Sequence, residues 1–110
     1  MEIWKDIATI EKQLESALKT LRINGTDYAE KEKLYRIAKA KKILELKSNG
    51  YPITIIPDLA KGDEEVADLD LQHNIAEVVY KANVEALHVK QQEYSLYKLY
   101  YDKEYTNTRG

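Results

Sequence analysis

Residues 50–62 read Gly50-Tyr-Pro-Ile-Thr-Ile-Ile-Pro-Asp-Leu-Ala-Lys-Gly62, and this stretch decides the fold because it separates two long helical patterns. It holds both prolines and two of the four glycines of the chain. The segment 53–56 is rich in β-branched residues, but prolines on both sides disfavour a strand. We expect instead a compact apolar turn, in which Thr54 caps a one-turn helix with Pro57 in its first turn.

The chain before this stretch predicts two helices. The first carries apolar residues alternately four and three positions apart, the pattern of a coiled-coil seam: Ile3, Ile7, Ile10, Leu14, Ala17 and Leu21. It is expected to span about 2–23 and to end at Asn24-Gly25, a good left-handed terminator. The second, over about 27–48, begins at Thr26 or Asp27 with Glu30 completing a capping box, and ends at Asn49-Gly50. Its apolar residues are Tyr28, Leu34, Ile37, Ala38 and Leu44.

The chain after this stretch predicts one long helix over about 63–104. Its first residues, Asp63, Glu64 and Glu65, suit the positive end of a helix dipole. Two apolar rows run along it: one holds Leu71, Ile75, Val78, Ala82, Val89, Leu96 and Tyr100, and the other holds Val66, Leu69, Ala76, Tyr80, Leu87, Tyr94, Tyr97 and Tyr101. We expect a helix with two such rows to be covered on two sides and to form the central element.

These patterns predict an all-α fold in a single helical domain, 1–110. Two N-terminal helices form an antiparallel hairpin that packs on the long C-terminal helix, with the compact turn over 49–62. The long helix would measure roughly 60 Å, whereas helices of about 20 residues reach only ~30 Å. The uncovered half carries too much apolar surface to face water. We therefore expect a homo-oligomer, with an interface that includes Leu96, Tyr97, Tyr100 and Tyr101.

The composition and the motifs exclude several functions. The 110 residues carry a net charge of -2 and no cysteine, which excludes disulfides and thiolate metal sites. No apolar run reaches the roughly 18–20 residues of a membrane span, and the start is not a signal peptide, so we expect a cytoplasmic protein with no membrane partner. The two histidines, His73 and His88, are too far apart on a helix to share a metal. Without a nucleophile or phosphate-loop motif, we expect no catalytic residue, no metal and no cofactor, and hence no enzyme.

Charge and tyrosine are distributed unevenly. Between 31 and 47 the chain has seven basic residues against two acidic ones, and between 58 and 70 it has six acidic residues against one basic. The two segments either pack side by side, or Arg36, Lys39 and Lys42 face outward as a phosphate-binding groove. Nine tyrosines occur with no phenylalanine, and five of them lie between 94 and 105. Tyrosine suits partly wet interfaces and also stacks on bases; the interface is the preferred interpretation.

The stretch 50–62 is also the predicted ligand site. Its isoleucines are expected to close the end of the bundle, while Thr54, Lys61 and the backbone at Gly62 lie near helix N-termini that can hold an anion. Tyr51 would stack on a ring of the ligand. Because Asp63, Glu64 and Glu65 would repel a phosphate, the site is expected to use basic residues from a second copy of the chain.

A family resemblance completes the prediction. The segments Trp4-Lys-Asp-Ile, Tyr28-Ala29, 50–62, Val66-Ala67 and Tyr80-Lys-Ala-Asn-Val-Glu-Ala86 resemble small helical phage and prophage proteins of Gram-positive bacteria. The resemblance implies an accessory protein acting in the host cell cytoplasm, and it implies no catalytic residue. Two hypotheses follow: capture of a small anionic ligand, such as a nucleotide signal of host defence, or an interaction or DNA-handling role in phage recombination and replication.

Overall fold

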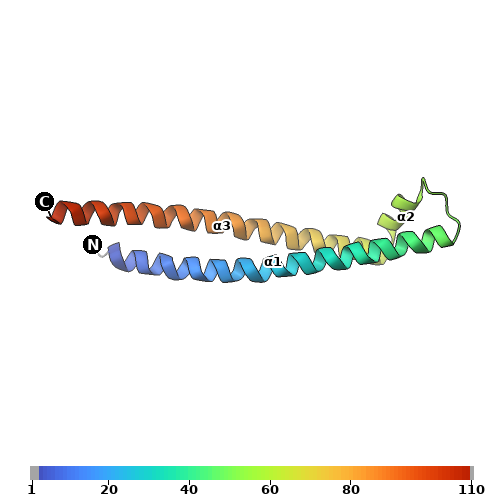
Figure 1. The fold of residues 1–110 in the computed structure, drawn as a ribbon, viewed down its shortest axis with the longest axis horizontal. Coiled ribbons are helices and arrows are strands. Elements are labelled where there is room, and N and C mark those ends of the chain that lie inside the picture. Colours follow the sequence, from blue (N-terminus) through green and yellow to red (C-terminus); the bar gives the residue numbers. More distant parts are fainter. Residues whose placement is uncertain (1–2, 110) are drawn as a thin grey trace. The chain divides into compact units, whose positions relative to one another are not determined.

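The computed structural model describes residues 3–109, with side chains for residues 3–106. It contains three helices, α1 (Ile3–Ser48), α2 (Ile56–Gly62) and α3 (Glu64–Arg109), and no strand within the described part (Figure 1). The all-α prediction is therefore confirmed. The chain divides into two compact units: one joins the residues up to Ile23 with those from Lys81 onward, and the other is Asn24–Tyr80.

The predicted break at Asn24-Gly25 is wrong, because α1 is one helix of 46 residues. The two N-terminal helices and the hairpin between them are therefore not formed, and no capping box exists at Asp27 and Glu30. Gly25 lies inside the helix against the ring of Tyr80: a Cβ added there would be 3.1 Å from Tyr80 Cε1. This glycine provides space for a close approach, which compensates the roughly 1 kcal/mol that glycine costs in a helix interior.

The continuous helix also changes which residues of α1 face α3. Leu34, Ile37 and Leu44 are exposed, by 49%, 41% and 63%. The half-buried positions instead continue the four-and-three spacing of the N-terminal seam without interruption: Asn24, Tyr28, Lys31, Tyr35, Ala38 and Lys42. The predicted first row, by contrast, is confirmed, since Ile7 and Ile10 are buried and Leu14, Ala17 and Leu21 are half-buried. The predicted start at residue 2 lies outside the described residues.

The second predicted stop, Asn49-Gly50, is confirmed. Gly50 has φ 81°, and two backbone hydrogen bonds close the helix: Gly50 N–H donates to Lys47 O, and Tyr51 N–H donates to Leu46 O. This is the Schellman arrangement, which needs a residue that tolerates positive φ. The one-turn helix is present as α2 with Pro57 in its first turn, but its N-cap is Ile55 and makes no side-chain hydrogen bond, so the prediction of Thr54 as cap is wrong.

In the unit Asn24–Tyr80, the core has an aliphatic part and an aromatic part. Leu46, Ile56 and Ala60 form a buried cluster against which Ile43 packs, and this cluster holds α2 on α1. The aromatic part centres on His73, whose ring lies 5.3 Å from that of Tyr28 and 5.7 Å from that of Tyr35. Tyr28 also contacts Tyr80, with ring centroids 5.7 Å apart. Tyr28 contacts Tyr80, whereas the later residue Tyr35 contacts the earlier residue His73. The two helices are therefore antiparallel in this unit.

In the other unit the two helices are also antiparallel. Ile7, Ile10 and Leu87 are its buried apolar residues among those described. Lys90 Nζ donates to Gln13 Oε1 at 2.7 Å, and Tyr94 Oη donates to Glu11 Oε1 at 3.2 Å. The apolar row of α3 that includes Leu87 and Tyr94 is thus the row that faces α1.

Candidate functional site

The predicted anion-binding residues lie on separate elements. Tyr51 and Thr54 belong to the connection between α1 and α2 and are exposed, as is Lys61 in the last turn of α2. Arg36, Lys39 and Lys42 lie on α1. None of these six residues is among the lining residues of the two grooves described below.

The basic residues of α1 are largely engaged with neighbours. Arg36 Nη2 lies 2.6 Å from Glu32 Oε1, and Lys39 Nζ lies 5.7 Å from the centre of the Tyr35 ring. Lys42 Nζ lies 3.4 Å from Asp63 Oδ1 and 3.6 Å from Glu45 Oε2. The contact between Lys42 and Asp63 joins the basic segment to the acidic one, which supports the side-by-side interpretation of their charges.

Asp63 occupies the start of α3. Its Oδ2 accepts a hydrogen bond from Val66 N–H at 3.1 Å, as an N-cap does. This hydrogen bond, followed by that with Lys42, lowers the pKa of the Asp63 carboxyl below its ordinary value of 3.8. The hydrogen bond to Asp63 in turn raises the pKa of Lys42 above 10.5. A carboxylate of the chain itself thus occupies the helix terminus that an anionic ligand would need.

The Asp63 cap predicts a specific pH dependence of stability. Because the folded state lowers the pKa of this carboxyl, its stabilising contribution is present above pH 3.8 and is lost as the pH falls through the folded-state pKa. We expect Asp63→Asn to lower Tm at neutral pH, and the difference from the unmodified protein to shrink below about pH 4. Glu30→Gln, at an exposed position, is the control, and thermal unfolding followed by circular dichroism is the measurement. A difference that stays constant down to pH 2 would contradict the assignment.

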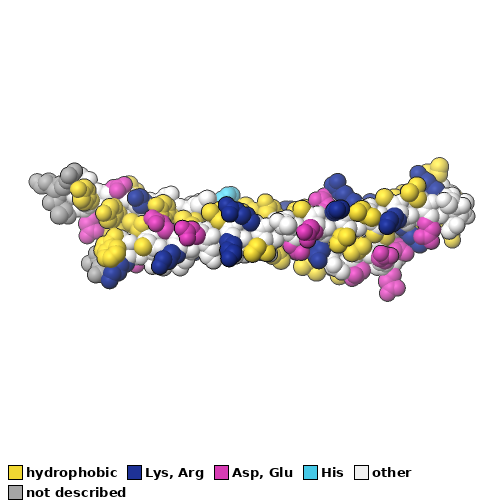
Figure 2. All heavy atoms as spheres, turned by 60° about the horizontal axis from the view of Figure 1, so that its bottom comes forward, with side chains coloured by type: hydrophobic (Ala, Val, Ile, Leu, Met, Phe, Trp, Pro, Cys, Tyr) yellow, Lys and Arg dark blue, Asp and Glu magenta, His cyan; other side chains and the backbone are white. Residues whose placement is uncertain are grey.

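The apolar row of α3 that runs from Leu71 to Tyr100 is largely exposed. In the unit that contains Lys81 onward, its large members are exposed: Val89 by 56%, Leu96 by 49% and Tyr100 by 53%, with Leu99 beside them at 63%. We call Val89, Gln92, Leu96 and Leu99 the outer strip; they repeat at spacings of three and four on one face of α3. In the other unit, Leu71, Ile75 and Val78 of the same row are also exposed. Figure 2 shows hydrophobic side chains reaching the surface between charges of both signs.

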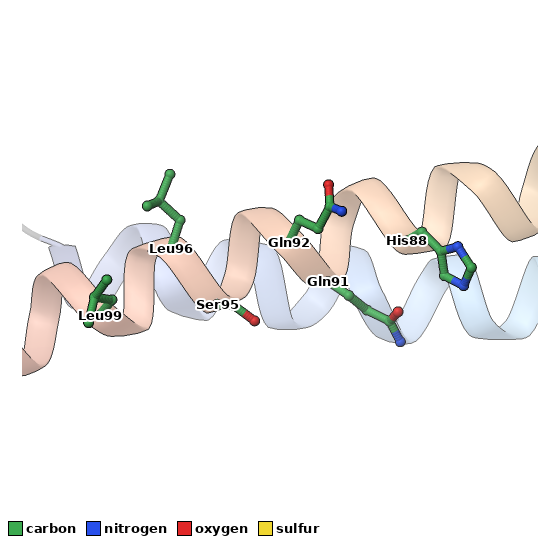
Figure 3. A pocket seen from close by; sticks show the side chains of 6 residues that line it. All are labelled: His88, Gln91, Gln92, Ser95, Leu96 and Leu99. Carbon is green, nitrogen blue, oxygen red and sulfur yellow. The ribbon is translucent and has the colours of Figure 1, made fainter.

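A shallow groove of about 540 Å³ follows the outer strip (Figure 3). Its lining comes entirely from α3: His88, Gln91, Gln92, Ser95, Leu96 and Leu99. None of these side chains is formally charged when histidine is neutral. Gln92 and Leu96 point away from the ribbon of α1, which leaves them free to meet another molecule. The groove has the character of a protein-binding face, with apolar centres and neutral polar neighbours.

The four predicted interface residues belong to two different faces. Leu96 and Tyr100 lie on the exposed row. Tyr97 is half-buried and shares the row of Tyr94, which faces α1. Tyr101 is 38% exposed and stacks on Tyr105 with ring centroids 6.5 Å apart. Two residues of the outer strip were not among the predicted interface residues. Val89 belongs to an apolar row that the sequence shows, whereas Gln92 is polar and cannot be identified from apolar spacing.

A second groove, of about 300 Å³, lies between α1 and α3 in the unit Asn24–Tyr80. Ile75, Ala76 and Val79 provide its apolar surface, and Asp27 and Lys31, which form an ion pair at 3.8 Å, lie at its edge. The other polar residues of its lining are Asn24 and Gln72, and Gln72 Nε2 donates to Asp68 Oδ2 at 2.9 Å. The sequence did not predict this groove, because Asn24 was placed at the end of one helix and Asp27 at the start of the next.

Metal-binding clusters and membrane-spanning helices are both absent from the described residues. No group of three or more histidine, cysteine or carboxylate side chains in the described part is arranged to hold a metal ion. None of the helices, as far as they are described, is long and apolar enough to cross a membrane. Comparisons with protein-family models, curated proteins and solved structures gave no significant match.

Proposed function

We propose that this chain is a non-enzymatic helical binding protein that associates with a second copy of itself through the outer strip of α3. The observation that carries the proposal is the exposure of Val89, Leu96, Leu99 and Tyr100 in a row on one face of an ordered helix. Contiguous apolar faces of this kind mark binding surfaces, whereas singly scattered exposed apolar residues do not. The groove along the same face supplies neutral polar groups to surround the apolar contacts.

The energetics support an association of moderate strength. Fully burying one large apolar side chain contributes about 1.5–3 kcal/mol, and about half of each of these four remains to be buried. Two copies would together gain on the order of 6–12 kcal/mol. The loss of translational and rotational freedom costs about 4–15 kcal/mol. The largest gain set against the smallest cost leaves about 8 kcal/mol, so a micromolar dissociation constant is the tightest that these contacts provide.

Sedimentation velocity over a concentration series tests the proposal. We expect the unmodified protein to shift from monomer to dimer in the micromolar range, and Leu96→Glu to raise the dissociation constant at least 100-fold, since it places two carboxylates in an apolar interface. Leu44→Glu is the matched control, because Leu44 is 63% exposed but lies on α1 in the other unit. Equal weakening by both variants, or none by Leu96→Glu, would show that the outer strip is not the interface.

A second proposal follows the phage resemblance: the oligomer, in the cytoplasm of the host cell, captures a small anionic ligand such as a nucleotide signal. It is supported by the exposed aromatic, hydroxyl and ammonium groups of Tyr51, Thr54 and Lys61, beside a loop in which Ile53 is 78% exposed.

Lys61→Glu distinguishes this second proposal from the DNA-handling alternative. We expect cyclic nucleotides or ADP-ribose derivatives to raise Tm of the unmodified protein, and Lys61→Glu to abolish the shift without unfolding the protein. Lys33→Glu, the same charge change at an exposed position of α1, should retain the shift. Binding of single-stranded DNA that weakens steeply with salt, with no response to nucleotides, would favour the DNA-handling role instead.

A further inference from the structure

We propose that the second copy lies antiparallel along the outer strip, so that Glu85 of each chain faces Lys103 of the other. The inference rests on the proposed self-association and specifies its orientation and register. Glu85 and Lys103 continue the three-and-four spacing of the outer strip at its two ends. Both are exposed, and neither has an ion-pair partner among the side chains of residues 3–106.

The strip is self-complementary when it is reversed. With Glu85 opposite Lys103 of the second copy, Val89 meets Leu99 and Gln92 meets Leu96, so that every apolar member has an apolar or neutral neighbour. The contacts occur twice by symmetry, as a two-fold interface requires. The oppositely charged ends then limit the register, since a slip by one heptad separates Glu85 from Lys103 and, in one direction, places Glu85 against Leu96.

The flanking residues fit the same register. On one side of the strip, His88 approaches Asp102 of the second copy and Ser95 approaches its own symmetry mate, and on the other side Ala86 approaches Tyr100. A small residue beside a large one allows close packing of the helices. Glu93 would approach its own copy near the centre, but its carboxylate lies 3.2 Å from Lys90 Nζ on the same helix, which offsets the repulsion.

A parallel arrangement is disfavoured by the same residues. In register, it would place Glu85 against Glu85 and Lys103 against Lys103 at core positions of the pair. Like charges facing each other in an interface are destabilising and specify against that arrangement. Reversal of one chain removes both repulsive pairs and converts them into attractions.

Disulfide trapping tests the orientation of the two chains. The chain has no cysteine of its own, so each disulfide must come from the introduced cysteines. Val89→Cys and Leu99→Cys, made separately and distinguished by a mass tag, are mixed and oxidised. We expect a disulfide between the two variants and none within either variant alone, because in the antiparallel register identical positions are about 15 Å apart along the axis. Disulfide dimers of each variant alone, at the concentration where the protein is a dimer, would establish the parallel arrangement and overturn the inference.

Charge reversal provides a second, independent readout. Glu85→Lys is expected to weaken the dimer about tenfold, since it replaces two attractions with two repulsions, and adding Lys103→Glu should restore the original affinity. In a parallel dimer neither change would matter, because like charges would face each other in all variants. A protein that sediments as a monomer and forms no disulfide in any mixture would instead overturn the proposed self-association itself.

Discussion

Gly25→Leu is expected to destabilise the protein by about 2–3 kcal/mol, even though leucine is the better helix former. A Cβ at this position would already lie 3.1 Å from Tyr80 Cε1 and 3.5 Å from its Cδ1. A leucine side chain must therefore displace the Tyr80 ring, which also packs on Tyr28. Urea unfolding measured by circular dichroism gives the free-energy difference.

The control for this prediction is Gly62→Leu, because a Cβ added at Gly62 has no neighbour within 4 Å. It should cost less than about 0.5 kcal/mol. Tyr80→Ala in the Gly25→Leu background tests the cause: if the clash is with the Tyr80 ring, the two changes together should cost less than the sum of their separate costs. A stabilised Gly25→Leu would show that α1 and α3 do not approach closely at this point.

Ile56→Ala is expected to cost about 3 kcal/mol and to detach α2 from α1. Ile56 is 2% exposed and packs with Leu46 and with Ala60, which is fully buried. A helix of seven residues has little stability of its own, so the packing of this side chain maintains it. The measurement is the free energy of unfolding together with hydrogen exchange at the backbone amides of α2.

Ile53→Ala is the matched control, since the same side chain is removed from a position that is 78% exposed. It should change the free energy of unfolding by less than about 0.5 kcal/mol and leave the exchange of α2 unchanged. Equal effects of the two substitutions would contradict the packing of α2 through Ile56.

The two Asn-Gly pairs show which helix ends could be predicted from the sequence and which could not. Asn49-Gly50 ends a helix as predicted, because Gly50 adopts positive φ and the following amide closes on Leu46 O. Asn24-Gly25 has the same residues but remains helical, since the glycine meets the Tyr80 ring from a helix that lies far along the chain. Local propensity is identical in the two places, and only the tertiary contact differs. The uninterrupted spacing through Tyr28 and Tyr35 was the available signal for a continuous helix.

The apolar rows of α3 were predictable for a related reason. Apolar residues at helical spacing indicate a buried face of the helix, although they do not indicate which element covers it. Val66, Ala76 and Leu87 lie in such a row and are buried. Periodicity alone could not tell which of the two rows α1 would cover. It also could not reveal that Arg36 and Lys39 contact residues of their own helix or that Lys42 contacts Asp63. These contacts weaken the prediction of an anion-binding groove.

An exposed face of α3, rather than an uncovered end of it, is what favours an oligomer. Sequence length suggested that two short helices would leave half of the long helix uncovered, but α1 and α3 each have 46 residues. What remains uncovered is a face of α3, made of Val89, Leu96 and Leu99 and bounded by Glu85 and Lys103. An exposed apolar face with oppositely charged ends is the property from which the proposed function derives.

Sedimentation equilibrium of the unmodified protein from 1 to 200 µM tests this central claim most directly. The account predicts a molar mass that rises with concentration from that of the 12.8 kDa chain to twice that value, with a dissociation constant in the micromolar range. A molar mass that stays at 12.8 kDa over the whole range would contradict it.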